Sequence, residues 1–267
     1  MFGNLTRVGS NYHAQEAWTN LKKVNGSMSQ IQSRMSTGKR INSAEDDTSG
    51  YALSKHLEGR VRGLSQALDN VGTAKNVLNI AEGGYQSQMS ILQTLKEKAT
   101  QAADGSWSAS QRGAINDQAT ALASEFADIA TDTTFNGNAL FGSTTAFQVG
   151  AGASDSLSVA LDASASVTVD LSTTAGATTA IGTLDTAIET LSGSIQKVGD
   201  FQARLSSKEE SLSLAISNTD ATRSRIEDAD FAKEQMEMMK LSVLQQTTLG
   251  SFAQANSSAQ MVLALFQ

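Results

Sequence analysis

The chain has 267 residues, with 27 acidic and 20 basic side chains and a formal net charge of −7. This acidic balance argues against a nucleic-acid-binding protein, which needs a basic patch to neutralise phosphates. Because there is no cysteine, disulfide frameworks, thiolate metal sites and thiol nucleophiles are excluded. The chain also has no proline and few aromatic residues, a composition that leaves long helices uninterrupted.

No segment is expected to cross a membrane. The longest apolar run near the end, Met261 to Phe266, is far shorter than the roughly 20 residues that a bilayer requires. The N-terminal residues lack the apolar region of a classical signal peptide. We therefore expect the protein either to stay inside the cell or to leave by a route that reads no such signal.

The N-terminal part of the chain predicts a helix with one apolar stripe. Apolar residues recur there at steps of three and four, as they do on one side of an α-helix. The stripe ends before Gly38 and consists of Ala17, Leu21, Val24, Met28, Ile31 and Met35. A polar stretch follows, in which Asn42 or Ser43 ahead of acidic residues indicates the start of a second helix.

The second predicted helix keeps its heptad spacing without a slip from Leu57 to Ala99. Its apolar positions form a seam of the kind that packs against another long helix. Three positions of this seam are charged, so the seam is imperfect: Lys75, Glu82 and Lys96. Asp104 and Gly105 are expected to end the helix.

A shorter helix and a β-rich insert are expected in the middle of the chain. Ser108 and Gln111 form a capping-box pair ahead of a stripe over residues 115–129, and an Asn-Gly turn follows at 136–137. Alternation at period two around Phe147 and over residues 157–161 predicts a small β-hairpin. Residues 167–171 are a candidate third strand, and residues 173–180 are expected to form a loop.

Helical spacing returns over residues 181–212, and a last helix is expected over residues 231–266. The two ends of the chain match in kind and suit a coiled coil. The expected fold is therefore mainly α, a long antiparallel helical coiled-coil rod formed by the N- and C-terminal halves, with a small β-hairpin insert. No internal repeat is present.

The sequence predicts no catalytic, cofactor-binding or metal site. His13 and His56 are far apart, and neither belongs to an HExxH run. Gly38-Lys39 fails as a P-loop end, because Ser33 occupies the first glycine position and Arg40 stands where a hydroxyl would bind magnesium. We therefore expect no enzyme and no cofactor.

Several motifs resemble those of the bacterial flagellin family. Residues 33–67 are similar to its RINSA.DD..G signature and the helix that follows, and residues 134–141 to its TFNG turn. Residues 221–234 are similar to SRIEDADYA.E, and residues 244–256 to LQQAG...LAQAN. The resemblance covers about residues 1–142 and 181–267. The chain departs from the family pattern at Phe231, where the family has tyrosine, and in a tail without proline.

The resemblance implies a short flagellin that lacks the large outer domains of longer members. Residues 1–43 and 228–267 would form the terminal helices of the inner filament tube. Residues 44–142 and 181–227 would form the helical rod domain, and residues 143–180 a variable hairpin or loop insert.

The resemblance also implies a function and a location. The chain would be a structural subunit that polymerises into the flagellar filament for swimming motility, after export in unfolded form by the flagellar type III apparatus. It would be extracellular, without a cleavable signal peptide. The implied partners are further copies of the chain, the export chaperone, the filament cap protein and the hook–filament junction proteins, with no nucleic acid and no membrane insertion.

We expect the terminal helices to drive polymerisation, because their apolar stripes would have no partner within one molecule. The residues assigned to self-assembly are Leu21, Val24, Met28, Ile31, Met35, Met239, Val243, Leu249, Phe252, Met261, Leu263, Leu265 and Phe266. Met236, Met238 and Met239 indicate either an adaptable binding surface or a packing stripe.

A second surface resembles the family's contact site for the host's Toll-like receptor. The family helix reads LQR(M/V)RELAV, with a glutamate on the next helix, where this chain has LQTLKEKAT over residues 92–100. The matching positions are Leu92, Gln93, Thr94, Lys96, Glu97, Lys98 and Glu125. Because Thr94 replaces an arginine and Lys98 a leucine, we expect weak or no receptor activation.

Two other interpretations remain open at this point. A flagellin-like hook–filament junction protein shares both termini, although it usually carries weaker copies of the two long signatures. A coiled-coil interaction protein that does not polymerise would form dimers or trimers that cannot elongate.

Overall fold

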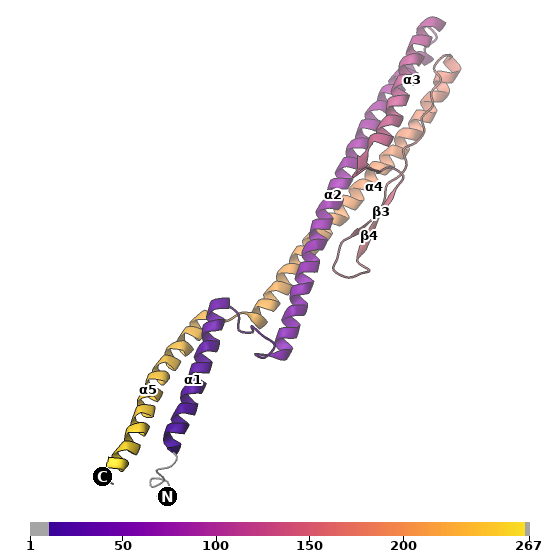
Figure 1. Cartoon of the computed structure of the whole chain (residues 1–267). Helices are drawn as coiled ribbons and strands as arrows, with labels where there is room; N and C mark the ends of the chain where they lie inside the picture. Colours follow the sequence, from indigo (N-terminus) through magenta and orange to yellow (C-terminus); the bar gives the residue numbers. More distant parts are fainter. Residues whose placement is uncertain (1–10, 265–267) are drawn as a thin grey trace. The chain divides into compact units, whose positions relative to one another are not determined.

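The computed structural model describes residues 11–264, with side-chain detail as far as residue 257. Five helices and two small antiparallel strand pairs follow one another along this part of the chain (Figure 1). The chain forms two compact units. One joins the residues up to Gly59 with those from Asn218 onward, and the other is Arg60–Ser217.

The first unit contains a pair of helices from opposite ends of the chain. Helix α1 (Tyr12–Thr37) packs along helix α5 (Phe231–Ala264), as Figure 1 shows. The Asn11 side chain accepts a hydrogen bond from the amide of Ala14 and so caps the start of α1. Gly38 ends the helix at φ 71°, a left-handed conformation that favours glycine. The helix predicted to end at Gly38 is confirmed.

The start predicted for the second helix, at Asn42 or Ser43, is wrong. Helix α2 (Thr48–Ala103) begins later, because Asp46 accepts hydrogen bonds from the amides of Asn42 and Ser43 and closes a turn there. Asp47 Oδ1 then accepts from the amide of Gly50 at 2.9 Å and caps the first turn of α2. The end of the helix before Asp104 is as predicted.

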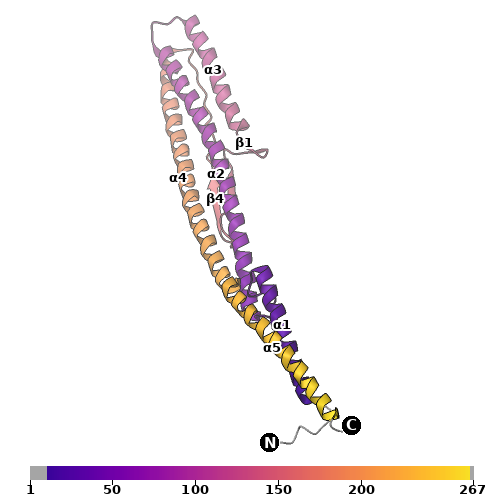
Figure 2. The ribbon, with the colours of Figure 1, turned by 90° about the vertical axis from the view of Figure 1, so that its left-hand side faces the viewer.

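The second unit is built on two long antiparallel helices, α2 and α4 (Thr174–Glu227) (Figure 2). Ion pairs show the direction: Lys75 meets Glu209, whereas Lys96, farther along α2, meets Asp185, earlier on α4. The α2 seam is buried at every seventh residue: Leu64, Val71, Leu78, Tyr85, Leu92 and Ala99. The α4 residues buried at the same spacing are Leu184, Leu191, Val198, Leu205 and Leu212. The predicted heptad seam is confirmed for this row of α2, whereas its other row, which includes Lys75, Glu82 and Lys96, is only half-buried.

The charged seam positions make polar contacts between these two helices. Lys75 Nζ and Lys96 Nζ pair with carboxylates of α4, and Glu82 accepts a hydrogen bond from Gln202 at 2.8 Å. All three residues are half-buried, as is typical of long charged side chains whose polar ends stay near solvent. The imperfection in the seam therefore helps to fix the register of the two helices.

Helix α3 (Ala109–Asp132) packs on α2 and begins with the predicted capping box of Ser108 and Gln111. Gln88 of α2 is fully buried, and its Nε2 donates to the carbonyl of Phe126 at 3.0 Å. Strands β1 (Thr134–Phe135) and β2 (Asn138–Ala139) then flank the predicted Asn-Gly turn. Asn136 and Gly137 both have positive φ, as this hairpin turn requires.

The insert holds one hairpin, of strands β3 (Thr144–Gln148) and β4 (Ser156–Ala160), in which Phe147 faces Leu157. The candidate third strand over residues 167–171 is not formed. Instead, residues 161–173 make an extended strap along the helices. Tyr85 Oη donates to the carbonyl of Asp162 at 2.6 Å, and Asn116 Oδ1 accepts from the amide of Leu171 at 2.8 Å.

The loop predicted over residues 173–180 is wrong, because α4 begins at Thr174. Thr173 Oγ1 accepts a hydrogen bond from the amide of Gly176 at 3.0 Å and caps the helix. Ala177 and Ala180 are buried in the core of this unit. Small, buried residues at i and i+3 therefore extend the helix into a stretch whose composition is typical of loops.

Candidate functional site

The α1 stripe assigned to self-assembly has a partner within the same molecule. Leu21 and Ile31 are buried, and Val24, Met28 and Met35 are half-buried, on the helix that packs against α5. The expectation that this stripe lacks a partner in one molecule is therefore wrong, since α5 provides one. Part of the stripe remains open to a further contact.

Helix α5 has two apolar faces rather than one. Leu241 is buried in the first unit, and Phe252 lies 6.0 Å from Trp18 of α1 between ring centroids. Met239 and Val243 are 61% and 63% exposed, and Leu249 is also exposed. Since residues three and four apart share a helix face, Met236, Met239 and Val243 form one stripe, on the side of α5 away from Leu241. We call these three residues the outward face of α5.

The remaining residues assigned to self-assembly lie at the end of the chain. Met261 and Leu263 belong to α5, but their side chains lie outside the described residues, as do Leu265 and Phe266 altogether. The assignment of these four residues to self-assembly stays a prediction.

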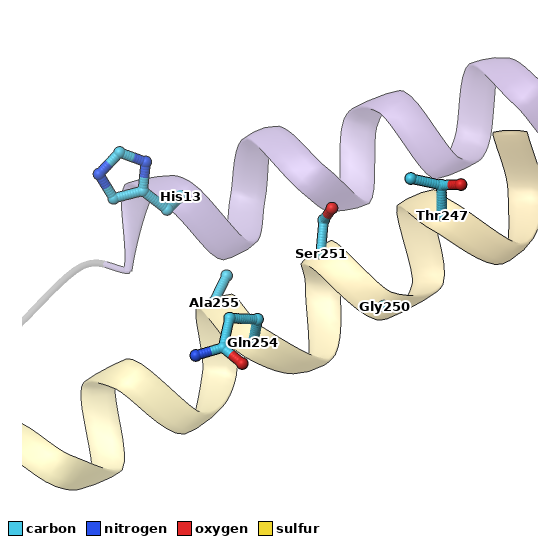
Figure 3. Close-up of a pocket in the computed structure, with 6 residues that line it drawn as sticks. All are labelled: His13, Thr247, Gly250, Ser251, Gln254 and Ala255. Atoms are coloured by element: carbon cyan, nitrogen blue, oxygen red, sulfur yellow. The ribbon is translucent and has the colours of Figure 1, made fainter.

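A shallow groove lies between α1 and α5 near the start of α1 (Figure 3). His13 is its lining residue from α1, and the other lining residues come from α5: Thr247, Gly250, Ser251, Gln254 and Ala255. Asn11 Nδ2 donates to the carbonyl of Ala255 at 2.9 Å and ties the two helices together here. The side chains that line the groove are small or polar.

Glu227 joins the turn before α2 to the end of α4. Its side chain is only 4% exposed, pairs with Lys39 at 2.5 Å and accepts from Ser54 Oγ at 2.7 Å. Its carbonyl accepts the amide of Arg40 at 2.6 Å. Glu227 thereby connects the turn between α1 and α2 to the turn between α4 and α5. Sequence analysis missed this role, although Glu227 stands inside the SRIEDAD motif.

The ionisation of Glu227 reflects this setting. Burial raises the pKa of its carboxyl group, but hydrogen bonds from Lys39 and Ser54 and the positive charges of Lys39 and Arg223 outweigh burial. The net result is a pKa below the ordinary glutamate value. Glu227 is therefore charged at neutral pH, as its ion pair requires.

One residue assigned to the receptor-like surface is not on the surface. Leu92 is 0% exposed, because it occupies a buried position of the α2 seam. Gln93, Glu97 and Glu125 are exposed, whereas Thr94 and Lys98 are half-buried. Lys96 Nζ is paired with Asp185 at 2.5 Å. The exposed residues of this surface are therefore polar, and Leu92, the apolar residue of the motif, does not contribute to it.

Within the described residues, no group of three or more His, Cys, Asp or Glu side chains is placed to hold a metal ion. The same part of the chain contains no helix with the length and apolar character needed to span a membrane. The candidate sites for binding are instead the groove between α1 and α5 and the outward face of α5.

Comparisons with known proteins agree with the motifs. The model of the bacterial flagellin N-terminal helical region matches residues 8–146, and that of the C-terminal helical region matches residues 181–266. Flagellin FlaB1 of Treponema pallidum (strain Nichols) is 30% identical over 97% of this chain and 99% of its own length. Flagellin of Bacillus subtilis (strain 168) is 30% identical over 98% of this chain and 100% of its own.

A crystal structure of Bacillus cereus flagellin aligns with 57% of this chain and 88% of its own, at 27% identity and a TM-score of 0.45. The two family models together match most of the chain and leave residues 147–180 between them unmatched. Both sequence relatives align along nearly the whole chain. The chain therefore belongs to the bacterial flagellin family, the family of flagellar filament subunits.

Proposed function

We propose that this flagellin polymerises by burying the outward face of α5 against a second copy of the chain. The observation that carries the proposal is the exposure of Met236, Met239 and Val243 on a helix whose other side already packs against α1. A helix that is apolar on both sides requires two neighbours. As the subunit of a filament, the chain meets a second copy of itself at every step of growth.

The roles of the segments follow from this arrangement. We assign residues 1–43 and 228–267 to the inner filament tube, residues 44–142 and 181–227 to the surrounding rod, and residues 143–180 to a variable insert. What supports the assignment is that α1 and α5 pair, that the rod residues share one core, and that the two family models leave residues 147–180 unmatched.

The wider biology is proposed on the basis of family membership. The chain would be exported unfolded through the flagellar type III apparatus, without a cleavable signal peptide, and would serve swimming motility as an extracellular structural protein rather than an enzyme. Its partners would be the export chaperone, the filament cap protein and the hook–filament junction proteins. Long helices free of disulfides and prolines support export in unfolded form.

Seeded elongation tests the assembly surface. Val243→Asp places a charge on the outward face of α5, and Leu214→Asp is the matched control, since Val243 and Leu214 are each 63% exposed. Sonicated filaments would seed growth in a salt that strengthens apolar burial, followed by negative-stain microscopy. We expect Val243→Asp to raise the critical concentration roughly tenfold or more, and Leu214→Asp to leave it unchanged. Equal elongation of both variants would refute the assignment.

Weak activation of the host's Toll-like receptor is the second proposal on partners. Thr94 Oγ1 bonds to the carbonyl of Ser90 in its own helix, Lys96 is held by Asp185, and Lys98 offers an ammonium where the family has leucine. An arginine fork and an apolar contact are both missing, which predicts binding weaker by roughly ten- to ten-thousandfold.

A reporter-cell dose response measures that effect. The monomer and its Thr94→Arg/Lys98→Leu variant would be compared over a wide concentration range. We expect the unmodified chain to be nearly silent and the double variant to gain potency. Full potency of the unmodified chain, or no gain from the double change, would contradict the proposal.

A further inference from the structure

Two of the three side chains on the outward face of α5 are exposed thioethers. Met236 and Met239 are 62% and 61% exposed. Met28, Met35, Met89 and Met238 are each half-buried, so they are less open to a reagent in solution. Methionine oxidation follows accessibility, and it converts a flexible apolar side chain into a polar one. Among the methionines with described side chains, these two are therefore the ones most open to an oxidant.

We propose that Met236 and Met239 are a reversible oxidation switch that decides whether a free subunit can join the filament. This inference rests on the proposed assembly surface and adds its regulation by a peroxide. A sulfoxide on the outward face of α5 would have to lose water and enter an apolar contact between two copies, which opposes assembly. Once a subunit is in the filament, the same contact shields both sulfur atoms.

The reaction balances with hydrogen peroxide as the oxidant. A lone pair of the thioether sulfur attacks one peroxide oxygen, a sulfur–oxygen bond forms and the oxygen–oxygen bond breaks. The sulfur loses two electrons, and the departing hydroxide takes the proton of the transferred oxygen and leaves as water. Methionine sulfoxide reductase with a dithiol reverses the change, since the dithiol becomes a disulfide and the sulfoxide oxygen leaves as water.

The test compares each protein with its own unoxidised form. Monomer would be treated with hydrogen peroxide at a series of concentrations, and the peroxide would then be removed. Peptide mass spectrometry would identify the oxidised methionines, and the treated monomer would be added to filament seeds. We expect sulfoxide at Met236 and Met239 before Met28, Met35 and Met89. We further expect the critical concentration of the oxidised wild type to be roughly tenfold higher than that of the unoxidised protein, and reductase to restore it. Preformed filaments should remain unoxidised at both positions.

Three variants decide where the effect arises. Met236→Leu/Met239→Leu should show an oxidised-to-unoxidised ratio near one, while Met89→Leu should keep the wild-type ratio. Met236→Gln/Met239→Gln mimics the polar product and should elongate poorly without peroxide, so this variant is decisive even if the leucine variant does not assemble. The inference is overturned if doubly oxidised wild type elongates normally, if the glutamine variant does, or if the leucine variant stays sensitive. Failure of the unoxidised wild type to elongate would instead overturn the proposed assembly function.

Discussion

Glu227 shows how one buried charge can organise two helix junctions. Its carboxylate faces Lys39 and Ser54, and its carbonyl holds the amide of Arg40. Glu227→Gln keeps the size of the side chain but removes the charge that Lys39 requires. We expect the free energy of unfolding of the first unit to fall by about 1–2 kcal/mol, because Lys39 is partly exposed and regains water.

Urea unfolding followed by Trp18 fluorescence in a Trp107→Phe background measures this change. Trp18 lies on α1 of the first unit, so its signal reports that unit. Glu237→Gln is the control, because Glu237 makes a more exposed pair with Lys240 and should change stability by less than about 0.5 kcal/mol. A Glu227→Gln variant as stable as Glu237→Gln would contradict the role assigned to the buried carboxylate.

The lowered pKa of Glu227 also predicts how stability depends on pH. A group whose pKa is lower in the folded state stabilises the fold above its unfolded pKa, near 4.3 for glutamate, and loses that effect as pH falls through the folded value. The stability difference between wild type and Glu227→Gln should therefore be constant from pH 7 to about 5 and shrink below about pH 4. A difference that persists unchanged at pH 2 would show that ionisation of Glu227 is not its cause.

At the scale of helices, the seam of the second unit is the element on which stability depends most. Leu205 is fully buried at one of the seven-residue positions of α4, whereas Leu214, nine residues later, is 63% exposed. Leu205→Ala should lower the free energy of unfolding by about 2–4 kcal/mol, since it removes buried methyl groups and leaves a cavity. Leu214→Ala should stay within about 0.5 kcal/mol. Thermal unfolding followed by circular dichroism would show both, and similar losses would mean that the seam is misplaced.

The heptad pattern allowed this seam to be predicted because α2 and α4 each bury one face. Strict spacing from Leu57 to Ala99 includes the row that is buried at every seventh residue from Leu64. It misses the second buried row, which begins at Ala67 and consists mostly of alanines. The start of α2 was missed because Asp46 accepts hydrogen bonds from the amides of Asn42 and Ser43 and so forms a turn before the helix. The neighbouring Asp47 caps the helix instead, and the sequence does not tell these two adjacent aspartates apart. The start of α4 was missed because buried alanines, rather than large apolar residues, hold its first turns.

The outward face of α5 could be predicted only in part. The sequence assigned Met239, Val243 and Phe252 to one assembly surface, but Phe252 lies beside Trp18 of α1, whereas Met239 and Val243 are exposed. In a helix that is apolar all round, spacing does not tell which side a neighbour covers. Leu92 is the converse case, since matching a receptor motif placed on the surface a residue that the α2 seam buries.

Across the whole molecule, burial is uneven between the two units. In the second unit, a continuous core runs from Leu64 to Leu212 and draws on three helices and the strap. In the first unit, few of the described apolar side chains of α1 and α5, which end at residue 257, are buried: Ala14, Leu21, Ile31 and Leu241. Local opening is easiest where few apolar contacts hold a segment, so the α1–α5 pair should open far more readily than the rod.

Limited proteolysis tests this difference and links it to assembly. A protease of broad specificity should trim the purified monomer to a fragment near residues 44–227, because cleavage follows local opening of α1 and α5. Filaments should resist, since contacts between copies cover the outward face of α5 and add the burial that the pair lacks alone. Glu227→Gln monomer should be trimmed faster than wild type, whereas Leu214→Ala should not. Equal resistance of monomer and filament would mean that assembly adds no stability to the terminal helices.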